Sequence, residues 1–323
     1  TAIKIAPHYR HPVVHVLDAS RAVPVTTSLL SDDHRDAFVT QLRADYDDLR
    51  RLHTGPKQPL VPLEAARGNA TPIVWRPEDV PTPASTGVVA VEAPLAALRH
   101  YIDWTPFFHT WELKGVYPRI LEHPVYGEQA KRVFYDANVL LDRIVAEGLL
   151  AARGVYGAFA VTAGIGLDAL VKGFRAQHDD YNATMAEALA DRLAEAFAEC
   201  LHHVVRKQWG YGQDEDLSVD DLLAEKYRGI RPAAGYPACP DHTEKATLWS
   251  LLDAEAQTGI RLTESYAMWP GSSVSGLYFA HPAARYFTLG KIDRDQVADY
   301  AARKGMTVAE VERWLGPNLG YTP

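Results

Sequence analysis

The chain has 323 residues, of which 47% are hydrophobic and 23% are charged, and its formal net charge is −8. This length and composition suit one large globular domain or two modest ones. The sequence contains no unbroken run of about 18 apolar residues that could cross a membrane. It also contains no concentrated Lys/Arg patch, which argues against a surface for duplex nucleic acid.

Only two cysteines occur, Cys200 and Cys239, and they form no CxxC pair. A disulfide framework and a cysteine zinc site are therefore not expected, and a reducing cytoplasmic location fits best. The start of the sequence has neither the pattern of a signal peptide nor an initiator Met. We expect it to be a piece of a longer chain.

Residues 1–53 begin with an apolar, β-branched run over 13–17, which predicts a buried strand. A helix is expected to follow through about residue 30, and a second helix rich in Asp and Arg over 31–53. One strand and two helices cannot close a core of their own. This segment is therefore interpreted as the end of an α/β domain whose beginning lies upstream.

Residues 54–90 form a proline-rich segment that predicts a stiff, extended linker and a domain boundary. Its prolines are Pro56, Pro59, Pro62, Pro72, Pro77, Pro81 and Pro83.

Residues 91–323 predict an α+β domain with helices around a mainly antiparallel sheet. Helical periodicity covers 128–147 and 181–208, while 158–162 and 277–280 read as strands. Two segments have the capping-box pattern of a helix start, 218–221 and 307–310. Residues 293–315 predict two helices around Gly305 that superficially resemble a helix-turn-helix, but their mixed charges favour packing over DNA binding.

The segment 231–242 holds three prolines and a glycine directly after a predicted helix, which predicts an irregular loop with exposed main-chain groups. At its mouth, the planar fork of Arg231 suits a ligand carboxylate. A rigid structural turn with a solvated arginine is the alternative, and residue types alone favour it.

Carboxylates recur every fourth residue on the helix predicted over 181–208, and they therefore share one stripe. Such a stripe is usually a solvated face, but one member could turn inward to meet a ligand. The stripe consists of Glu187, Asp191, Glu195 and Glu199.

Asp103 stands among aromatic and aliphatic residues in the segment 101–108. A buried carboxylate needs donors or a cation, so either a helix cap or a ligand amine would explain it, and both remain open.

The motif Arg-Pro-Ala-Ala-Gly-Tyr-Pro over 231–237 resembles the RxxxGYP signature of the activation domain of cobalamin-dependent methionine synthase. Further similar segments spread over most of residues 95–323. These segments are 101–108, 177–181, 190–197, 268–271, 311–315 and 317–321.

Residues 1–50 resemble the end of the cobalamin-binding domain of the same enzyme. The resemblance implies that Ala19, where the family's last strand meets the cofactor, contacts cobalamin. The family's DxHxxG motif, which supplies the histidine under cobalt, is absent and expected upstream, so this chain alone should not hold cobalamin firmly.

The resemblance implies a function in reductive reactivation. S-adenosylmethionine donates a methyl group to cobalamin while flavodoxin or a flavoprotein reductase supplies an electron. The other implied partners are the upstream cobalamin-binding, folate and homocysteine modules, without nucleic acid or membrane. A sulfonium methyl needs no general base, so neither a catalytic residue nor a metal site is expected. A reductase-docking module that binds no ligand is the alternative.

Eight residues of this chain match the family's contacts to S-adenosylmethionine: Asp103, Glu195, Arg231, Ala233, Gly235, Tyr236, Tyr286 and Phe287. Among them, the resemblance assigns the ligand carboxylate to Arg231. It assigns acidic contacts to Asp103 and Glu195, while 233–236 contribute loop contacts, largely through the backbone. Phe287 lacks a hydroxyl, so any polar contact there must come from its main chain.

This sequence departs from the family pattern at 153–158, where members of the family usually carry several tens of additional residues. Those residues include strands of the central sheet, so the number of strands in this chain is left open.

Overall fold

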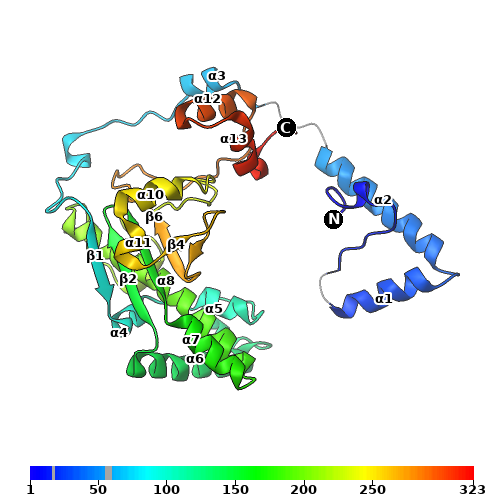
Figure 1. Ribbon diagram of the computed structural model, residues 1–323, viewed down its shortest axis with the longest axis horizontal. Helices are drawn as coiled ribbons and strands as arrows, with labels where there is room; N and C mark the ends of the chain where they lie inside the picture. The colour runs from blue at the N-terminus through cyan, green and yellow to red at the C-terminus, as the bar shows by residue number, and fades with distance from the viewer. Residues whose placement is uncertain (17–18, 55–59) are drawn as a thin grey trace. The chain divides into compact units, whose positions relative to one another are not determined.

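The computed structural model describes residues 1–16, 19–54 and 60–323. It divides into two compact units, residues 1–61 and residues 62–323. Figure 1 shows the elements of both units.

The described residues of the first unit contain two α-helices, α1 (Ala19–Leu30) and α2 (Arg35–Thr54), as the sequence predicts, and a short 3-10 helix over Ala6–His8. The predicted strand is wrong over residues 13–16, which form no regular element, and residue 17 lies outside the described residues. A strand needs a neighbour to take up its backbone groups, and the described part of this unit offers none. The carbonyl of Val13 instead accepts a hydrogen bond of 2.9 Å from the hydroxyl of Tyr46.

The second unit is built on a four-stranded antiparallel sheet in the order β1-β2-β3-β6. This confirms the predicted α+β class with a mainly antiparallel sheet. The strands are β1 (Val89–Ala93), β2 (Ala151–Tyr156), β3 (Phe159–Ile165) and β6 (Ser273–Gly276). A separate ribbon pairs β4 (Arg261–Leu262) with β5 (Met268–Trp269).

Strand β3 is buried on both faces, because helices cover the sheet on each side. Phe159 and Val161 belong to the main hydrophobic cluster with α8 (Asp180–Gln208). The alternate residue Ala160 belongs to a second cluster, which includes residues of α10 (Glu244–Leu252) and α11 (Ala254–Thr258). Because side chains alternate along a strand, this division yields three layers, helix, sheet and helix.

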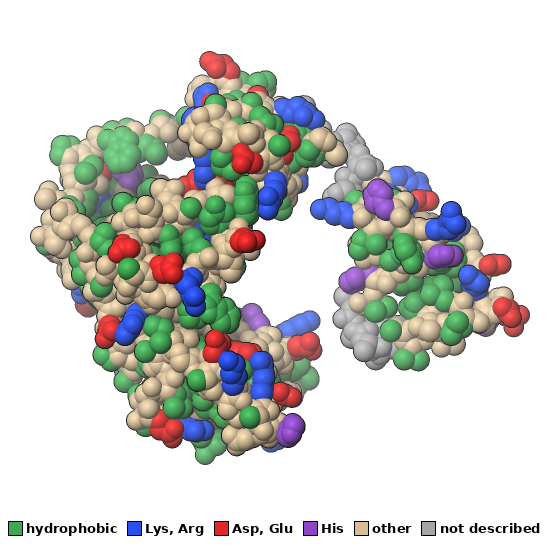
Figure 2. Space-filling model, in the orientation of Figure 1, with side chains coloured by type: hydrophobic (Ala, Val, Ile, Leu, Met, Phe, Trp, Pro, Cys, Tyr) green, Lys and Arg blue, Asp and Glu red, His purple; other side chains and the backbone are tan. Residues whose placement is uncertain are grey.

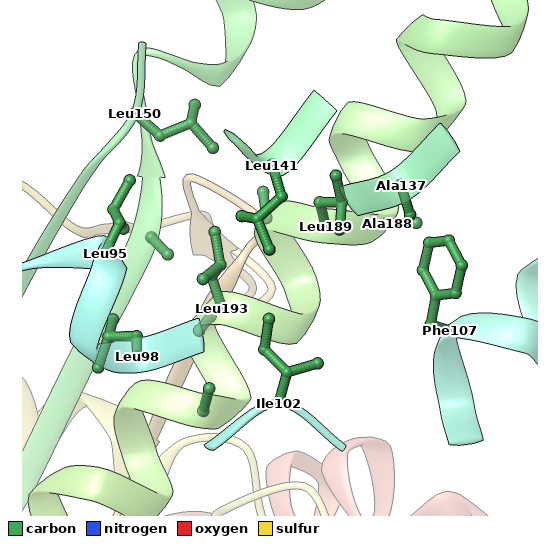
Figure 3. Close-up of a cluster of buried hydrophobic side chains, with 14 of the residues drawn as sticks. Leu95, Leu98, Ile102, Phe107, Ala137, Leu141, Leu150, Ala188, Leu189 and Leu193 are labelled. Carbon is green, nitrogen blue, oxygen red and sulfur yellow. The ribbon is translucent and has the colours of Figure 1, made fainter. Parts of the chain in front are cut away.

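Helix α8 is the longest described element, and its N-cap is Asp179, whose side chain accepts the Asn182 N–H at 3.0 Å. Its apolar side includes Leu189 and Leu193, which Figure 3 shows directed into the same cluster as Leu141 of α6 (Gly127–Glu147). The helical periodicity predicted for 128–147 and 181–208 is thus confirmed. The long apolar stripe of α8 sets one wall of the domain.

The second unit also contains four shorter α-helices between residues 95 and 223. They are α4 (Leu95–Leu98), α5 (Thr105–Thr110), α7 (Leu167–Ala176) and α9 (Val219–Leu223), the last of which begins with the predicted capping box at Ser218.

The C-terminal residues form a helix pair with a small core of its own. Helix α12 (Arg294–Lys304) ends at Gly305 with φ +70°, and α13 (Val308–Trp314) begins with the predicted capping box at Thr307. The core of the pair consists of Ile292, Val297, Ala301, Val311, Leu315 and Leu319. Packing therefore accounts for the pattern that superficially resembled a DNA-binding motif.

The strand predicted over 277–280 is displaced, since the structure has β6 over Ser273–Gly276. Beyond Gly276 only an isolated bridge joins Phe279 to Ile230. Between these positions the neighbouring backbone carries Pro232, whose ring removes one ladder donor. Its carbonyl still accepts the Leu277 N–H at 2.9 Å, but the pairing cannot extend into a strand.

Most of the described part of the predicted linker, residues 62–90, belongs to the second unit and holds α3 (Leu63–Gly68). Arg67 pairs with Asp299 of α12 at 2.7 Å, and Figure 1 shows α3 beside α12. Further along, the Ala84 N–H donates to the Gln208 carbonyl at 3.0 Å. This segment is extended over much of its length but lies against the domain. The boundaries 1–53, 54–90 and 91–323 stay a prediction.

At the expected departure from the family, β2 and β3 join in a tight hairpin. Tyr156 pairs with Phe159, so Gly157 and Ala158 alone form the turn. The strands pair directly across it, and the ladder is complete without further residues here.

Candidate functional site

A cavity of about 490 Å³ lies where α8, the sheet and the loop after α9 meet. Its lining includes six of the eight residues predicted to contact the ligand: Glu195, Arg231, Ala233, Tyr236, Tyr286 and Phe287. They come from three separate parts of the chain, a helix, a proline-rich loop and the segment after β6. Such a concave meeting point of a few polar groups and apolar walls is a typical small-molecule site.

The loop 231–242 lies closely along the end of β6. A Cβ atom at Gly276 would stand 2.4 Å from the carbonyl oxygen of Pro232, so only glycine permits this approach. At Gly235 the backbone has φ +97°, and an added Cβ would meet the ring of His242 at 2.3 Å. The Gly235 N–H donates to the Cys239 carbonyl at 2.7 Å. These contacts give the loop a defined, compact shape.

Arg231 extends from this loop into a buried set of partners. Its Nη2 lies 2.6 Å from Oε2 of Glu199, and its Nη1 donates to the hydroxyl of Tyr227 and lies 3.4 Å from Nδ1 of His202. Its backbone N–H donates to the hydroxyl of Tyr286 at 3.0 Å. The guanidinium is therefore held from behind while Arg231 also lines the cavity.

The charges of Arg231 and Glu199 depend on each other. Burial alone would lower the pKa of Arg231, but the nearby Glu199 carboxylate, followed by Tyr227, outweighs burial and raises that pKa. Burial raises the pKa of Glu199, and Arg231 opposes that shift. The side chain of Glu199 is only 4% exposed, so removing Arg231 would leave a carboxylate without its counter-charge.

His202 completes this buried group as a neutral ring. Burial, followed by the charges of Arg206 and Arg231, lowers its pKa to about 2. Arg206 lies one helical turn further along α8, is fully buried and pairs with Glu215 at 2.9 Å. Glu199, His202 and Arg206 thus form a buried polar row on α8 directly behind the cavity.

The sequence did not single out Glu199 as a partner of Arg231, although it placed Glu199 on the carboxylate stripe of α8. One member of that stripe does face inward, and that residue is Glu199, whereas Glu195 is exposed and lines the cavity. Glu225 also lines the cavity and was not predicted. The four-residue spacing was the available signal, but it could not say which carboxylate would be buried.

Three aromatic residues of the cavity lining are exposed to solvent, whereas Phe159 is buried. Tyr236 is 63% exposed and Phe287 is 62% exposed, while Tyr286 is 45% exposed. Burial of its hydroxyl region nevertheless raises the pKa of Tyr286. These rings provide apolar surface at the mouth of the cavity, where a ligand could cover them.

Three predicted residues do not join the cavity lining: Gly235 of the loop, Asp103 and Ala19. Asp103 is exposed, and its carboxylate accepts a hydrogen bond of 2.9 Å from the N–H of Thr105, the first residue of α5. Its role as a ligand contact stays a prediction. Ala19 is the first residue of α1 in the first unit, and its side chain lies outside the described residues.

A second cavity of about 650 Å³ lies between the same loop and the C-terminal helix pair. It shares Pro232, Ala238 and Phe287 with the first cavity, so the loop separates the two. In its lining, the Asp241 carboxylate accepts a hydrogen bond of 2.6 Å from the Tyr300 hydroxyl, and it also lies 2.9 Å from Nζ of Lys304.

Two comparisons with known proteins agree with this fold. The family model described as "Vitamin B12 dependent methionine synthase, activation domain" matches residues 94–159 and 156–305. This chain belongs to that family. The activation domain is one domain of cobalamin-dependent methionine synthase, a methyltransferase. The two matched segments meet at the β2–β3 hairpin, where the sequence departs from the family pattern.

A solved structure described as "Crystal Structure of the MetH Reactivation Domain bound to AdoHcy" is similar over most of the chain. The identity is 50% and the TM-score is 0.79, with 82% of this chain and 100% of that chain covered. The fold of this activation domain is therefore that of the reactivation domain.

Among the described residues, no helix is long and apolar enough to cross a membrane. On the face of the second unit shown in Figure 2, Lys/Arg and Asp/Glu side chains are interspersed. That face presents no continuous positive surface for nucleic acid.

Proposed function

We propose that this activation domain binds S-adenosylmethionine in the cavity around Arg231 and presents its methyl group during reductive reactivation of methionine synthase. The observation that carries the proposal is the convergence of six predicted ligand residues on one cavity of about 490 Å³. The similar solved structure is described as bound to AdoHcy, the product that remains after methyl donation, and this supports the same ligand class here.

The chemistry requires binding and aiming rather than acid–base groups, because a sulfonium methyl is already activated toward a nucleophile. Arg231 would bind the ligand carboxylate, and the exposed carboxylates of Glu195 and Glu225 would attract its ammonium and sulfonium charges. The exposed rings of Tyr236 and Phe287 would cover the ligand and keep water from the methyl group.

Cobalamin does not fit the described residues of this chain alone. The described part of residues 1–61 holds two α-helices and no sheet to enclose a corrin ring. Cobalamin, the methyl acceptor, is therefore assigned to the upstream module, with Ala19 as a proposed contact. Flavodoxin or a flavoprotein reductase is the proposed electron donor, the folate and homocysteine modules are proposed neighbours, and the cytoplasm is the proposed location.

Calorimetric titration of S-adenosylmethionine into the chain tests this proposal. We expect saturable 1:1 binding that Arg231→Ala weakens by about 10- to 100-fold, the range for a hydrogen bond to a charged group. Arg143→Ala, which removes an exposed ion pair with Glu147 on α6, is the matched control and should bind as the parent does. A folded, monodisperse sample that gives no binding heat would instead favour the docking module without a ligand.

A further inference from the structure

Several carboxylates lie close enough to Arg231 to be considered as its ion-pair partner. Glu195 and Glu225 line the same cavity and are exposed. A flexible arginine beside them would turn toward either one, and its guanidinium would then be unavailable to a ligand carboxylate. In this structure it instead pairs with Glu199, which lies behind the cavity and outside its lining.

The geometry behind Arg231 is that of a fixed support. Glu199 and His202 come from α8, which packs against the sheet along its length, and Tyr227 lies four residues before Arg231. Three contacts to these side chains use at most three of the five N–H donors of the guanidinium. At least two donors remain for a ligand that enters the cavity.

We propose that Glu199 is a positioning residue that holds the Arg231 guanidinium in the orientation that binds the carboxylate of S-adenosylmethionine. This inference rests on the proposed function, because it concerns the same ligand. Glu199 contacts Arg231 and not the ligand. Its burial makes it effective, since a carboxylate shielded from water holds its partner more firmly than the exposed Glu195 and Glu225 would.

The proposal makes a prediction about ligand choice that a merely structural role would not make. Loss of Glu199 frees Arg231 to pair with Glu195 or Glu225, so only ligands with a carboxylate lose a contact. Decarboxylated S-adenosylmethionine keeps the adenosyl, sulfonium and amino groups and lacks only the carboxylate. Its binding should therefore be insensitive to Glu199, whereas the binding of S-adenosylmethionine should not.

The experiment measures the affinity of both ligands for the full chain by calorimetry. We expect Glu199→Ala to weaken S-adenosylmethionine by about 10- to 100-fold and its decarboxylated form by less than about threefold. Glu199→Gln keeps a hydrogen-bond acceptor at the same place and should recover most of the affinity. Glu187 also lies on α8 and forms an exposed ion pair with Arg175 of α7, and Glu187→Ala should change neither affinity.

Glu199→Ala leaves a buried guanidinium without its partner, and if that variant does not fold, Glu199→Asp carries the same test. It keeps the charge but withdraws the carboxylate by one methylene group, so the loss should again be confined to the ligand with a carboxylate. In the double variant with Arg231→Ala, removal of Glu199 should cost no further affinity.

Equal losses for both ligands, or no loss for either, would overturn the positioning role. Failure of the parent chain to bind S-adenosylmethionine would instead overturn the proposed function itself, so the two failures are distinguishable.

Discussion

The hydroxyl of Tyr286 accepts a hydrogen bond of 3.0 Å from the backbone N–H of Arg231, across 55 residues of sequence. This contact ties the segment after β6 to the first residue of the proline-rich loop. The side chain of Arg231 is held by Glu199 and its main chain by Tyr286, so both ends of the residue are fixed.

Tyr286→Phe removes this acceptor while it keeps the ring, so the variant isolates the contact to the Arg231 main chain. Affinity for S-adenosylmethionine should fall about threefold to tenfold in a calorimetric titration, because one neutral hydrogen bond is lost. Tyr135→Phe is the control, since Tyr135 is 69% exposed on α6. An unchanged affinity would mean that the loop keeps its shape without Tyr286.

Gly235→Ala should weaken ligand binding by distorting the loop. Gly235 has φ +97°, which a residue with a Cβ adopts only with strain, and its Cβ would collide with the ring of His242. We expect a loss of about 5- to 150-fold in affinity for S-adenosylmethionine, since a cost of about 1–3 kcal/mol must be relieved by movement of the loop.

Gly271→Ala is the matched control for Gly235→Ala, because nothing lies within 4 Å of a Cβ built at Gly271 and its φ is not in the left-handed region. It should leave affinity unchanged. If Gly235→Ala binds as tightly as this control, the shape of the loop does not limit binding.

The sequence predicted the long helices and the ligand loop well, because each depends on local signals. The periodic apolar residues of 181–208 and the prolines of 231–242 are visible without tertiary information. The burial of Glu199 is different, since four carboxylates share one stripe and only the packing of the loop against α8 selects which one is covered.

Strand positions were harder to predict, because a strand requires a partner. The apolar run at 277–280 has the composition of a strand, but the backbone opposite it carries Pro232 and cannot continue the ladder. Residues 13–16 have the same composition and no strand beside them in the described part of their unit. Composition thus indicates which segments could pair, while the neighbouring chain decides which do.

The buried neutral ring of His202 should make the stability of the second unit depend on pH. Its pKa is lowered to about 2 in the folded state, against about 6.5 in an unfolded chain. Below about pH 6.5 the unfolded state therefore binds more protons, and stability falls as the pH decreases toward 2. Between pH 7 and pH 5 this single group should lower the free energy of unfolding by about 2 kcal/mol.

Denaturant unfolding at the two pH values measures this effect in the parent chain and in His202→Gln. We expect His202→Gln to be less stable than the parent at pH 7. Its free energy of unfolding should nevertheless fall less between pH 7 and pH 5, because the contribution of His202 is missing. His100→Gln changes an exposed histidine and should retain the full dependence. The same pH dependence in all three proteins would assign it to other groups.

Lys304 should hold the C-terminal helix pair on the domain. Its Nζ lies 2.9 Å from Asp241 and 2.6 Å from Glu244, and the hydroxyl of Tyr300 donates to both carboxylates. Burial alone would raise the pKa of Asp241, but Lys304, followed by Tyr300, outweighs it and lowers that pKa. The stabilisation from Asp241 is therefore present above its unfolded pKa and is lost as the pH falls through the folded value.

Lys304→Ala leaves the carboxylate of Asp241, which is 4% exposed, without its cation and should destabilise the docking of α12 and α13 by about 1–3 kcal/mol. Hydrogen exchange should become faster in residues 292–321 while α8 keeps its protection, because the helix pair has a separate core. Lys172→Ala, at an exposed position of α7, should leave exchange unchanged. If exchange instead accelerates equally in α8, the helix pair is part of one cooperative unit with the sheet, and the cluster around Asp241 is not a local attachment.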